Sequence, residues 1–484
     1  MQTIQKDQPK VLLISSLTEF GERYSYYMLQ SLLILFLVFH FKIAQNISAV
    51  LVGTVLSMIY ISAIVGGFIA DKILGYYRSA FLGSLMMIIG SLLLSASKTI
   101  DVLYLGLCFI SISTGLIKSN ISSFIGRYYD RSGLPHSYRD FGFSVFYVGI
   151  NLGSFLAFLL ASFLANKYGY NVAFYSSIFI NALMIINLII GYFILSQYIT
   201  DMKLTFKMIA QALILVIVYM IIVFIILKNP IIANLSIFIA AILCAAILIR
   251  ASMKDKNYKH AIIATIFFIL SIIYWALYFQ MFISLELFIK SVVNHHFLGF
   301  TIQTTQFFSV ESLAILILGF FMGRLWIYLD KRGKAIHDID KFNLAFIIML
   351  GIFIFFYVAI MMTTGTEKIS AVVIIIGFFI WAISELSLSA IGLSLMTKIA
   401  PKGFVSLYMG IWLVTLGIGG KFSGLLASNI TITNNVIASK TSMQHGLILF
   451  IAYTIGGILI CIISRKFIMR HLATNKKSNS AEAM

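Results

Sequence analysis

Charged residues are scarce in this sequence. Only 11% of its 484 residues are Asp, Glu, Lys or Arg, whereas 61% are hydrophobic. Soluble domains carry about 25% charged residues, so the composition excludes an ordinary soluble protein and indicates a polytopic membrane protein. Proline is rare as well, with four in the chain. Long Ile, Leu and Phe runs without alternation predict membrane helices and exclude a β-barrel.

Cysteine is rare, and common catalytic motifs are missing. Cys108, Cys244 and Cys461 lie in apolar runs, and the chain has no CxxC motif. We therefore expect thiols packed between helices, not a disulfide or a metal site. The sequence also contains no Walker loop, HExxH or GxSxG motif. These absences predict a protein that is not an enzyme, with no catalytic residues, no metal and no cofactor.

Acidic residues are outnumbered by basic ones, 17 to 35, which gives a net charge of +18. The basic residues gather in alternate loops, so their distribution fits the positive-inside rule and not a nucleic-acid surface. This rule places both termini in the cytoplasm. The chain starts with MQTIQKDQPK, which lacks a cleavable signal pattern, so we expect the first span to be retained.

Apolar windows of about 20 residues, long enough to cross a bilayer, recur along the chain. They lie near residues 15–39, 49–70, 77–97, 102–124, 140–165, 171–195, 206–227, 231–250, 260–289, 308–329, 341–362, 369–398, 403–429 and 444–468. We therefore predict an all-α membrane protein with fourteen transmembrane helices. Its expected parts are an N-terminal six-helix bundle (1–197), a two-helix insertion (198–256), a C-terminal six-helix bundle (257–470) and a cytoplasmic tail (471–484).

A short internal sequence repeat supports a chain made of two related halves. Gly66–Ala80 and Gly319–Ala335 each place small residues, then charge, then a basic turn with glycine, after corresponding spans. Paired six-helix halves are the layout of the major facilitator fold. The alternative is that any cytoplasmic hairpin collects Gly and Lys. The insertion helices have almost no polar residue in their middle, so we predict a peripheral pair without direct chemistry.

The first predicted span contains three charges. Glu19, Glu22, Arg23, Tyr26 and Gln30 are spaced at i, i+3, i+4, i+7 and i+11, which places them on one helix face. Charges at bilayer depth cost about 2.5–3.5 kcal/mol each, so they must face a cavity or one another. Desolvated carboxylates beside an arginine are suited to gain and lose a proton. The alternative is an ion cluster that only fixes helix packing.

Few other ionisable groups lie at depth, among them Lys118, Glu311, Glu385 and Lys421, and the amide of Asn151 lies in the fifth predicted span. A buried lysine in one half and a buried glutamate in the other are natural partners, so we predict a cytoplasmic-side gate formed by Lys118 and Glu385. The alternative is that hydroxyls and backbone carbonyls satisfy each of them within its own half. For Lys421, a functional role and a side chain that snorkels toward the headgroups both stay open.

Several motifs resemble one known family. EFGERYSYY at Glu19–Tyr27 resembles the ExxERFxYY signature of the proton-dependent oligopeptide transporter (POT) family, which belongs to the major facilitator superfamily. GGxxADxxxG at Gly66–Gly75 and FYVGINLG at Phe146–Gly153 are similar to two further signatures of that family. Glu385, with Gly392–Pro401 and Met409–Trp412 after it, resembles the tenth and eleventh spans. The resemblance covers essentially the whole chain, including the bacterial two-helix insertion.

The resemblance implies a bacterial inner (plasma) membrane symporter that imports di- and tripeptides with protons by alternating access. It further implies a monomer in the lipid bilayer with no nucleic-acid partner. Glu19, Glu22 and Arg23 would couple protonation to transport. The implied substrate-binding residues are Arg23, Tyr26, Tyr27, Tyr60, Lys118, Tyr147, Asn151, Gln280, Glu311, Glu385 and Trp412.

Within that set, the resemblance assigns the two ends of the peptide to different residues. Arg23, Lys118 and Tyr27 would hold the carboxylate, while Glu385 and Asn151 would receive the amino group. A zwitterion needs a cationic and an anionic pole across a cavity, which agrees with this assignment.

The sequence departs from the family pattern at several positions. Gln30 and Phe279 stand where a usual ion pair is charged, and Glu286 stands where Asn is common. Glu311 adds a carboxylate that would favour cationic peptides or take a second proton. Substrate range and proton stoichiometry therefore stay open. Two other functions also stay open: transport of other small amphoteric solutes such as amino acids, and a membrane sensor that no longer transports.

Overall fold

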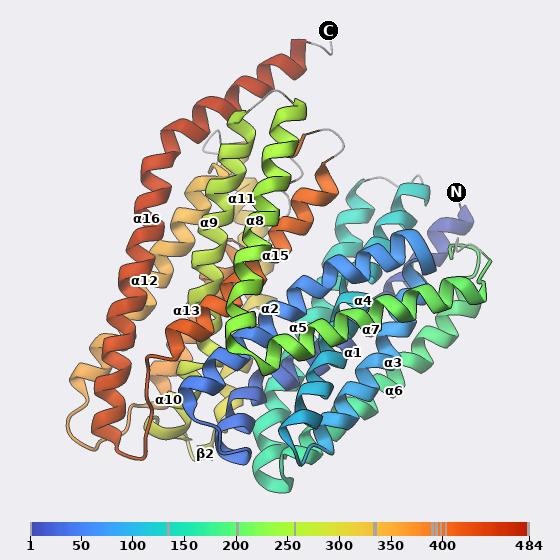
Figure 1. The fold of residues 1–484 in the computed structure, drawn as a ribbon. Helices are drawn as coiled ribbons and strands as arrows, with labels where there is room; N and C mark the ends of the chain where they lie inside the picture. Colours follow the sequence, from blue (N-terminus) through green and yellow to red (C-terminus); the bar gives the residue numbers. More distant parts are fainter. Residues whose placement is uncertain are drawn as a thin grey trace. The chain divides into compact units, whose positions relative to one another are not determined.

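The computed structural model describes residues 2–132, 136–199, 203–255, 258–332, 336–388, 392, 395–396, 399–401 and 404–481 (Figure 1). Parts of several predicted features lie outside these residues: positions 333–335 of the second repeat segment, residues 200–202 and 256 of the insertion, seven positions of the tenth span, which include four of the Gly392–Pro401 motif, and the last three residues of the tail.

Helices dominate the described chain. The first part contains α1 (Gln2–Leu35), η1 (Phe36–His40), α2 (Gln45–Ile69), η2 (Ala70–Leu74), α3 (Tyr76–Ser95), α4 (Ile100–Ser132), α5 (His136–Tyr168), α6 (Tyr170–Ile194), α7 (Phe206–Lys228) and α8 (Pro230–Asp255). The second part contains α9 (Tyr258–Tyr278), η3 (Phe279–Phe282), α10 (Ser284–Val292), β1 (His296–Phe297), β2 (Phe300–Thr301), η4 (Thr304–Phe307), α11 (Phe308–Lys331), α12 (Asp338–Met362), α13 (Ala371–Leu386), α15 (Val405–Ala427) and α16 (Val436–Ala481).

Within the described residues, twelve helical segments are long and apolar enough to cross a membrane. Two further helices complete the set of fourteen predicted spans: α1, which carries the three buried charges, and the shorter apolar α13. The expected all-α polytopic class is confirmed. Several helices extend past the apolar windows, because a span needs only about 20 apolar residues and its polar ends continue into water.

The ninth predicted span is not one continuous α-helix. Near residues 260–289 the chain forms α9, then the 3₁₀ turn η3, then α10. Neither Pro nor Gly lies at the break. Gln280 sits in η3 and donates from Nε2 to Ser423 O at 2.9 Å. A side-chain bond to a distant helix thus accompanies the break, and no local sequence signal marks it.

The chain divides into two compact units, which differ from the predicted division at its edges. Unit 1 contains residues 1–44, 54–234 and 303–313, and unit 2 contains residues 45–53, 235–302 and 314–484. The predicted insertion is therefore shared: α7 belongs to unit 1 and most of α8 to unit 2. The predicted domain boundaries themselves stay a prediction.

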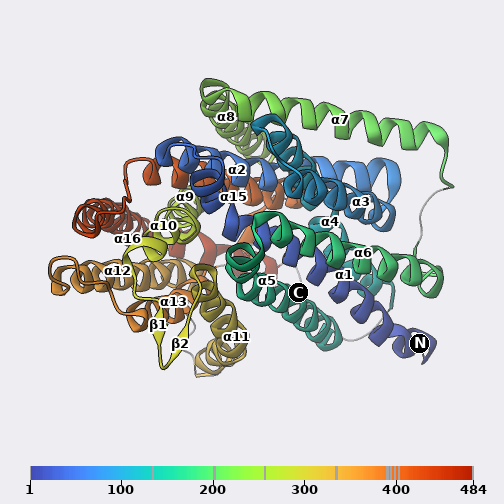
Figure 2. The same ribbon diagram turned by 90° about the horizontal axis from the view of Figure 1, so that it is seen from below.

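In unit 1, α1 packs against α5, α6 and α4, and α3 packs against α4 and α6 (Figure 2). Part of α2 belongs to the same unit, and glycines bring it very close to α4. A Cβ on Gly66 would collide with the carbonyl of Gly115, and a Cβ on Gly115 would collide with Ser62. Asn120 Nδ2 donates to the Gly66 carbonyl at 3.3 Å. These contacts fix the α2–α4 pair that carries Tyr60 and Lys118.

The helix α7 attaches to unit 1 through a polar contact that the sequence analysis did not predict. Tyr219 lies near the middle of α7, where we expected almost no polar residue. Its hydroxyl donates to Met58 O at 2.5 Å and lies 2.9 Å from Ser111 Oγ. One buried hydroxyl therefore links α7 to both α2 and α4.

In unit 2, α9 packs against α15 and α16, and α12 packs against α13 and α16. The short antiparallel pair β1–β2 aligns His296 with Thr301. Gly299 makes its turn with φ 81°, a conformation that glycine adopts without strain. Aromatic side chains fill much of the interior of this unit, including the fully buried Trp381 and Tyr274.

Candidate functional site

The three charges of α1 form one buried cluster in unit 1. Arg23 Nη2 donates to Glu22 Oε1 at 2.6 Å, and Arg23 Nε contacts Glu22 Oε2, so the pair is bidentate. Arg23 Nε also lies 3.4 Å from Glu19 Oε1. All three side chains are at most 3% exposed. The structure thus brings together the residues predicted to couple protons.

The charge of this cluster does not balance. Two carboxylates surround one guanidinium, so the fully ionised cluster carries one surplus negative charge. Glu19 Oε2 is buried without a hydrogen-bond partner in the described part of the chain. Buried charge that lacks a partner is costly in a low-dielectric interior. One added proton would neutralise the surplus charge and let the protonated carboxyl act as a donor.

Aromatic rings connect Arg23 to Lys118. Arg23 Cζ lies 4.7 Å from the ring centroid of Tyr26 and 5.8 Å from that of Tyr27. The Tyr26 hydroxyl donates to the Tyr60 hydroxyl at 3.5 Å. Lys118 Nζ lies 5.1 Å from the centroid of the Tyr60 ring. Five predicted site residues from α1, α2 and α4 therefore adjoin one another, with both cations against aromatic faces.

Close packing of α5 on α1 positions Arg23. A Cβ on Gly153 would lie 2.7 Å from Phe20 O and 3.1 Å from Arg23 Cβ, so only glycine lets the two backbones approach this closely. Gly149, one turn earlier, faces Ser16 O in the same way. These are the two glycines of the FYVGINLG segment. Their spacing explains why the segment packs directly beside the charged cluster.

The predicted residues of α5 have mainly local contacts. Asn151 Nδ2 donates to Tyr147 O at 2.9 Å, within its own helix. Ser154 Oγ donates to Asn151 O at 2.9 Å and lies 3.0 Å from Ser312 Oγ of α11. Tyr147 is 37% exposed, whereas Asn151 is 5% exposed.

Glu311 is buried in the residues of α11 that belong to unit 1. Ser312 Oγ donates to Glu311 Oε2 at 3.4 Å, and the neighbouring Ser154 lies on α5. The side chain is 3% exposed. The buried carboxylate of Glu311 therefore ends a chain of polar contacts that runs from Ser154 on α5 through Ser312.

In unit 2, Glu385 has a hydrogen-bond donor on α9. The Tyr278 hydroxyl donates to Glu385 Oε2 at 2.9 Å. The adjacent Ser384 donates to Ala345 O at 2.8 Å and pairs with the Tyr274 hydroxyl at 3.1 Å. The alternative to a Lys118–Glu385 gate is that each residue is satisfied by polar groups of its own half. The Tyr278 hydroxyl is such a partner for Glu385. Lys118 and Glu385 belong to different units, so the gate stays a prediction.

Gln280 and Trp412 are enclosed in unit 2. Gln280 is fully buried, and its amide bonds to Ser423 and accepts from Ser284 Oγ at 2.7 Å. A role in substrate binding would require these bonds to be exchanged. Trp412 is 3% exposed and packs beside Phe342, with ring centroids 6.1 Å apart. That Trp412 lines the substrate pocket stays a prediction.

Two further ionisable groups, Lys421 and Glu286, are buried. Lys421 is 1% exposed, so its side chain is buried. Glu286 is fully buried, and neither of its carboxylate oxygens has a hydrogen-bond partner in the described residues.

Sequence reasoning missed Tyr278. It shares a face of α9 with Tyr274, four residues earlier, and this hydroxyl pair was the available signal. In the described part of the chain, no three His, Cys, Asp or Glu residues cluster in a way that would hold a metal ion.

The chain is similar to peptide transporters along most of its length. It is 25% identical over 469 residues to dipeptide and tripeptide permease A of Escherichia coli (strain K12), covering 95% of this chain and 93% of that one. It is 28% identical over 444 residues to the peptide transporter YePEPT of Yersinia enterocolitica subsp. palearctica, covering 86% of each.

Solved structures agree on the fold. A bacterial homologue of the human drug peptide transporters PepT1 and PepT2 superposes with a TM-score of 0.83 at 22% identity, over 96% of this chain and 99% of that chain. The peptide transporter POT in complex with sulfate gives a TM-score of 0.82 at 22% identity, over 95% and 94%. These likenesses confirm the predicted major facilitator fold.

The sequence profile of the POT family matches residues 77–443, about three quarters of the chain. The signature at Phe146–Gly153 lies inside this range, whereas those at Glu19–Tyr27 and Gly66–Gly75 lie before it. The chain is a multi-pass membrane protein that belongs to the POT family.

Proposed function

We propose that this protein imports di- and tripeptides together with protons by alternating access. The observation that carries the proposal is the buried α1 cluster, in which Arg23 is shared between Glu22 and Glu19 beside the cation Lys118. Family membership and the names of the relatives, dipeptide and tripeptide permeases, supply the substrate class.

The proton acts on the charge of the α1 cluster. With both carboxylates ionised, Arg23 is held by Glu22 and Glu19. Protonation of one carboxylate weakens its hold on the guanidinium, which then has donors free for another anion. The carboxylate of a peptide is such an anion. Proton binding and peptide binding are therefore linked through one arginine.

The two ends of the peptide need opposite charges. Arg23, Lys118 and Tyr27 supply cations and a hydroxyl for the carboxylate. For the amino group, Glu385 supplies the anion and Asn151 an amide oxygen. Recognition of the two termini, with aromatic residues such as Tyr26 and Tyr60 around them, explains tolerance of different side chains.

Glu385 must exchange the Tyr278 hydroxyl, or share it, when it binds an ammonium group. The predicted cytoplasmic-side gate uses the same carboxylate. When no peptide is bound, Lys118 is the cation expected to pair with Glu385. A reciprocal charge exchange tests this: Lys118→Glu with Glu385→Lys restores part of the uptake that either single variant loses.

The protein acts as a monomer in the inner membrane of a bacterium, with both termini in the cytoplasm. The positive-inside distribution of Lys and Arg supports this orientation. Cysteine accessibility measured in intact cells, with single cysteines placed at the exposed Lys98 and Lys207, tests it. Lys98 is expected to react with an impermeant reagent, and Lys207 is expected to be protected.

Transport by the purified protein in proteoliposomes tests the function. A lumenal pH dye and labelled dialanine report proton influx and peptide uptake under an imposed acid-outside gradient. We expect dialanine to drive proton influx and to accumulate. Uptake of alanine without dialanine would instead assign a transporter of other amphoteric solutes. Binding of dialanine without flux would assign a sensor.

A further inference from the structure

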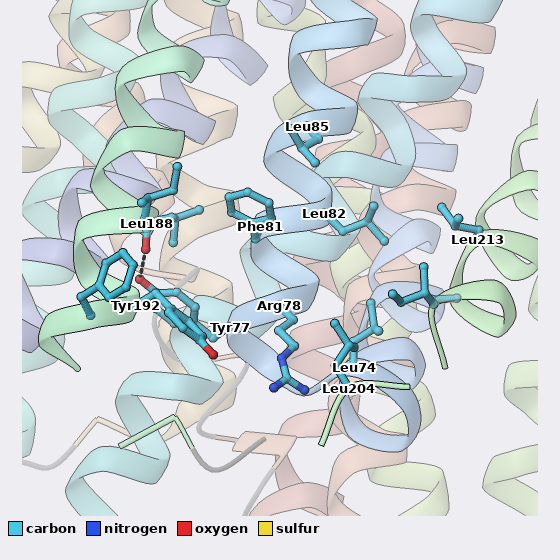
Figure 3. A pocket seen from close by; sticks show the side chains of 14 residues that line it. Leu74, Tyr77, Arg78, Phe81, Leu82, Leu85, Leu188, Tyr192, Leu204 and Leu213 are labelled. Atoms are coloured by element: carbon cyan, nitrogen blue, oxygen red, sulfur yellow. Dashed lines mark hydrogen bonds between the residues drawn. The ribbon is translucent and has the colours of Figure 1, made fainter. Parts of the chain in front are cut away.

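An apolar groove lies between α3, α6 and α7 of unit 1. Its volume is about 550 Å³, and its walls come from the end of η2, from α3, α6 and α7, and from Leu204 in the segment before α7. Figure 3 shows Arg78, Leu74 and Leu204 toward one end and Leu85 toward the other. The volume lies in the range of pockets that hold small ligands, roughly 300–1,000 Å³.

A hydrogen bond joins two helices at the floor of the groove. The Tyr77 hydroxyl donates to Leu188 O at 2.7 Å and so joins α3 to α6 (Figure 3). Gly191 on α6 lies directly under the same hydroxyl, where a Cβ would collide with it. Beyond this floor, the wall side chains are almost all aliphatic or aromatic. The groove therefore fits a flexible hydrocarbon chain and not a polar solute.

Charge is confined to one end of the groove. Arg78 is the single charged side chain among the lining residues, and it lies half-buried. Exposed lysines flank the same end in the sequence: Lys72 precedes Leu74, and Lys203 and Lys207 surround Leu204. From Arg78 to Leu85 the helix rises about 10 Å, so the groove leads from this basic end toward the bilayer interior.

We propose that an anionic phospholipid seats one acyl chain in this groove and its phosphate against Arg78. The apolar wall takes the chain, and the guanidinium matches a phosphate in geometry and charge. Basic pockets between membrane helices on the cytoplasmic side are typical sites for anionic headgroups. This gives the predicted peripheral helix α7 a role, because Ile209, Ala212 and Leu213 form one wall of the groove.

The test uses the full-length protein in detergent and native mass spectrometry with palmitoyl-oleoyl phosphatidylglycerol. Phosphatidylcholine with the same chains and free oleate are the comparison ligands. We expect phosphatidylglycerol to bind most tightly. Arg78→Gln should lower its affinity about fivefold, the effect of one basic residue near a membrane surface. Leu82→Trp should abolish binding by filling the groove.

Two matched variants serve as controls. Arg250→Gln removes an exposed basic residue on α8, and Leu92→Trp enlarges a 48% exposed residue of α3 outside the groove. Both should bind phosphatidylglycerol as the wild type does. Leu213→Trp fills the groove from the α7 wall and replaces Leu82→Trp if that variant does not fold.

Three results would overturn the proposal. Equal affinity for phosphatidylcholine and phosphatidylglycerol, unchanged in Arg78→Gln, would show a groove that does not sense charge. Unchanged phosphatidylglycerol binding in the groove-filling variants would place the lipid elsewhere. Oleate that displaces phosphatidylglycerol with equal affinity through Arg78 would assign the site to a fatty acid.

Discussion

Arg23 and Glu22 are neighbours in the sequence, yet their side chains form a bidentate ion pair, with Nη2 and Oε1 2.6 Å apart. Glu19, one turn earlier, reaches the same guanidinium from 3.4 Å. One arginine thus has two buried carboxylates as competitors. In the function we propose, protonation of either carboxylate frees donors of Arg23 for the peptide carboxylate, which links proton binding to peptide binding.

Lys118→Ala should abolish driven uptake and lower dialanine affinity at least about tenfold, because a charged hydrogen-bond partner of the peptide carboxylate is lost, worth about 1.5–3 kcal/mol. Isothermal titration and uptake assays measure the two effects. Lys98→Ala removes an exposed lysine of a loop and should change neither. Unchanged dialanine affinity in Lys118→Ala would reject the carboxylate assignment.

Tyr278→Phe should weaken dialanine binding several-fold, without abolishing uptake. The hydroxyl holds Glu385 Oε2 at 2.9 Å and orients the carboxylate that we assign to the peptide amino group. Loss of one hydrogen bond to a charged group is worth roughly 1.5–3 kcal/mol at most. N-acetylated dialanine lacks the ammonium group, so its weak binding should be the same in both proteins. An equal loss for both ligands would indicate a structural effect.

Gly66→Ala should destabilise unit 1, while Gly67→Ala should not. A Cβ on Gly66 would collide with the carbonyl of Gly115, whereas a Cβ on Gly67 meets no atom within 4 Å. Overpacking costs about 1–3 kcal/mol, and alanine exceeds glycine in helix propensity by up to about 1 kcal/mol. Thermal unfolding of the two variants in one detergent compares them. Equal melting temperatures would contradict the packing described for α2 and α4.

Asp7→Asn should destabilise the protein near neutral pH and have less effect in acid. Hydrogen bonds from Lys10 and Tyr198 lower the pKa of Asp7 below its ordinary value of 3.8. The ionised carboxylate therefore stabilises the fold above that value, and the contribution is lost as the pH falls through the lowered pKa. Melting temperatures against pH measure this. Asp330→Asn, at an exposed position, should run parallel to the wild type.

The α1 cluster was predictable because charge is so rare in this chain. Three ionisable groups on one helix face within an apolar run have few ways to avoid lipid, and the structure pairs them as expected. The spans were predictable because a long apolar run with few charges can be recognised from the local sequence alone. The adjacency of Tyr26, Tyr60 and Lys118 needed the family resemblance, because rings are abundant here.

Other features depend on residues far apart in the sequence. Tyr278 is one of 24 tyrosines, and its partner Glu385 follows 107 residues later. The break at η3 accompanies the bond from Gln280 to Ser423, and the attachment of α7 depends on Tyr219. Such pairings are set by tertiary packing, so neither periodicity nor composition could have predicted them.

The most direct test compares driven uptake with exchange in Glu22→Gln. The substitution keeps the shape of the side chain and removes the carboxylate that binds Arg23 most closely. Glu367→Gln, in an exposed loop, is the matched control. In proteoliposomes, we predict that Glu22→Gln loses dialanine accumulation under a pH gradient yet exchanges dialanine across the membrane without one. Gradient-driven accumulation at the wild-type level in Glu22→Gln would contradict the account.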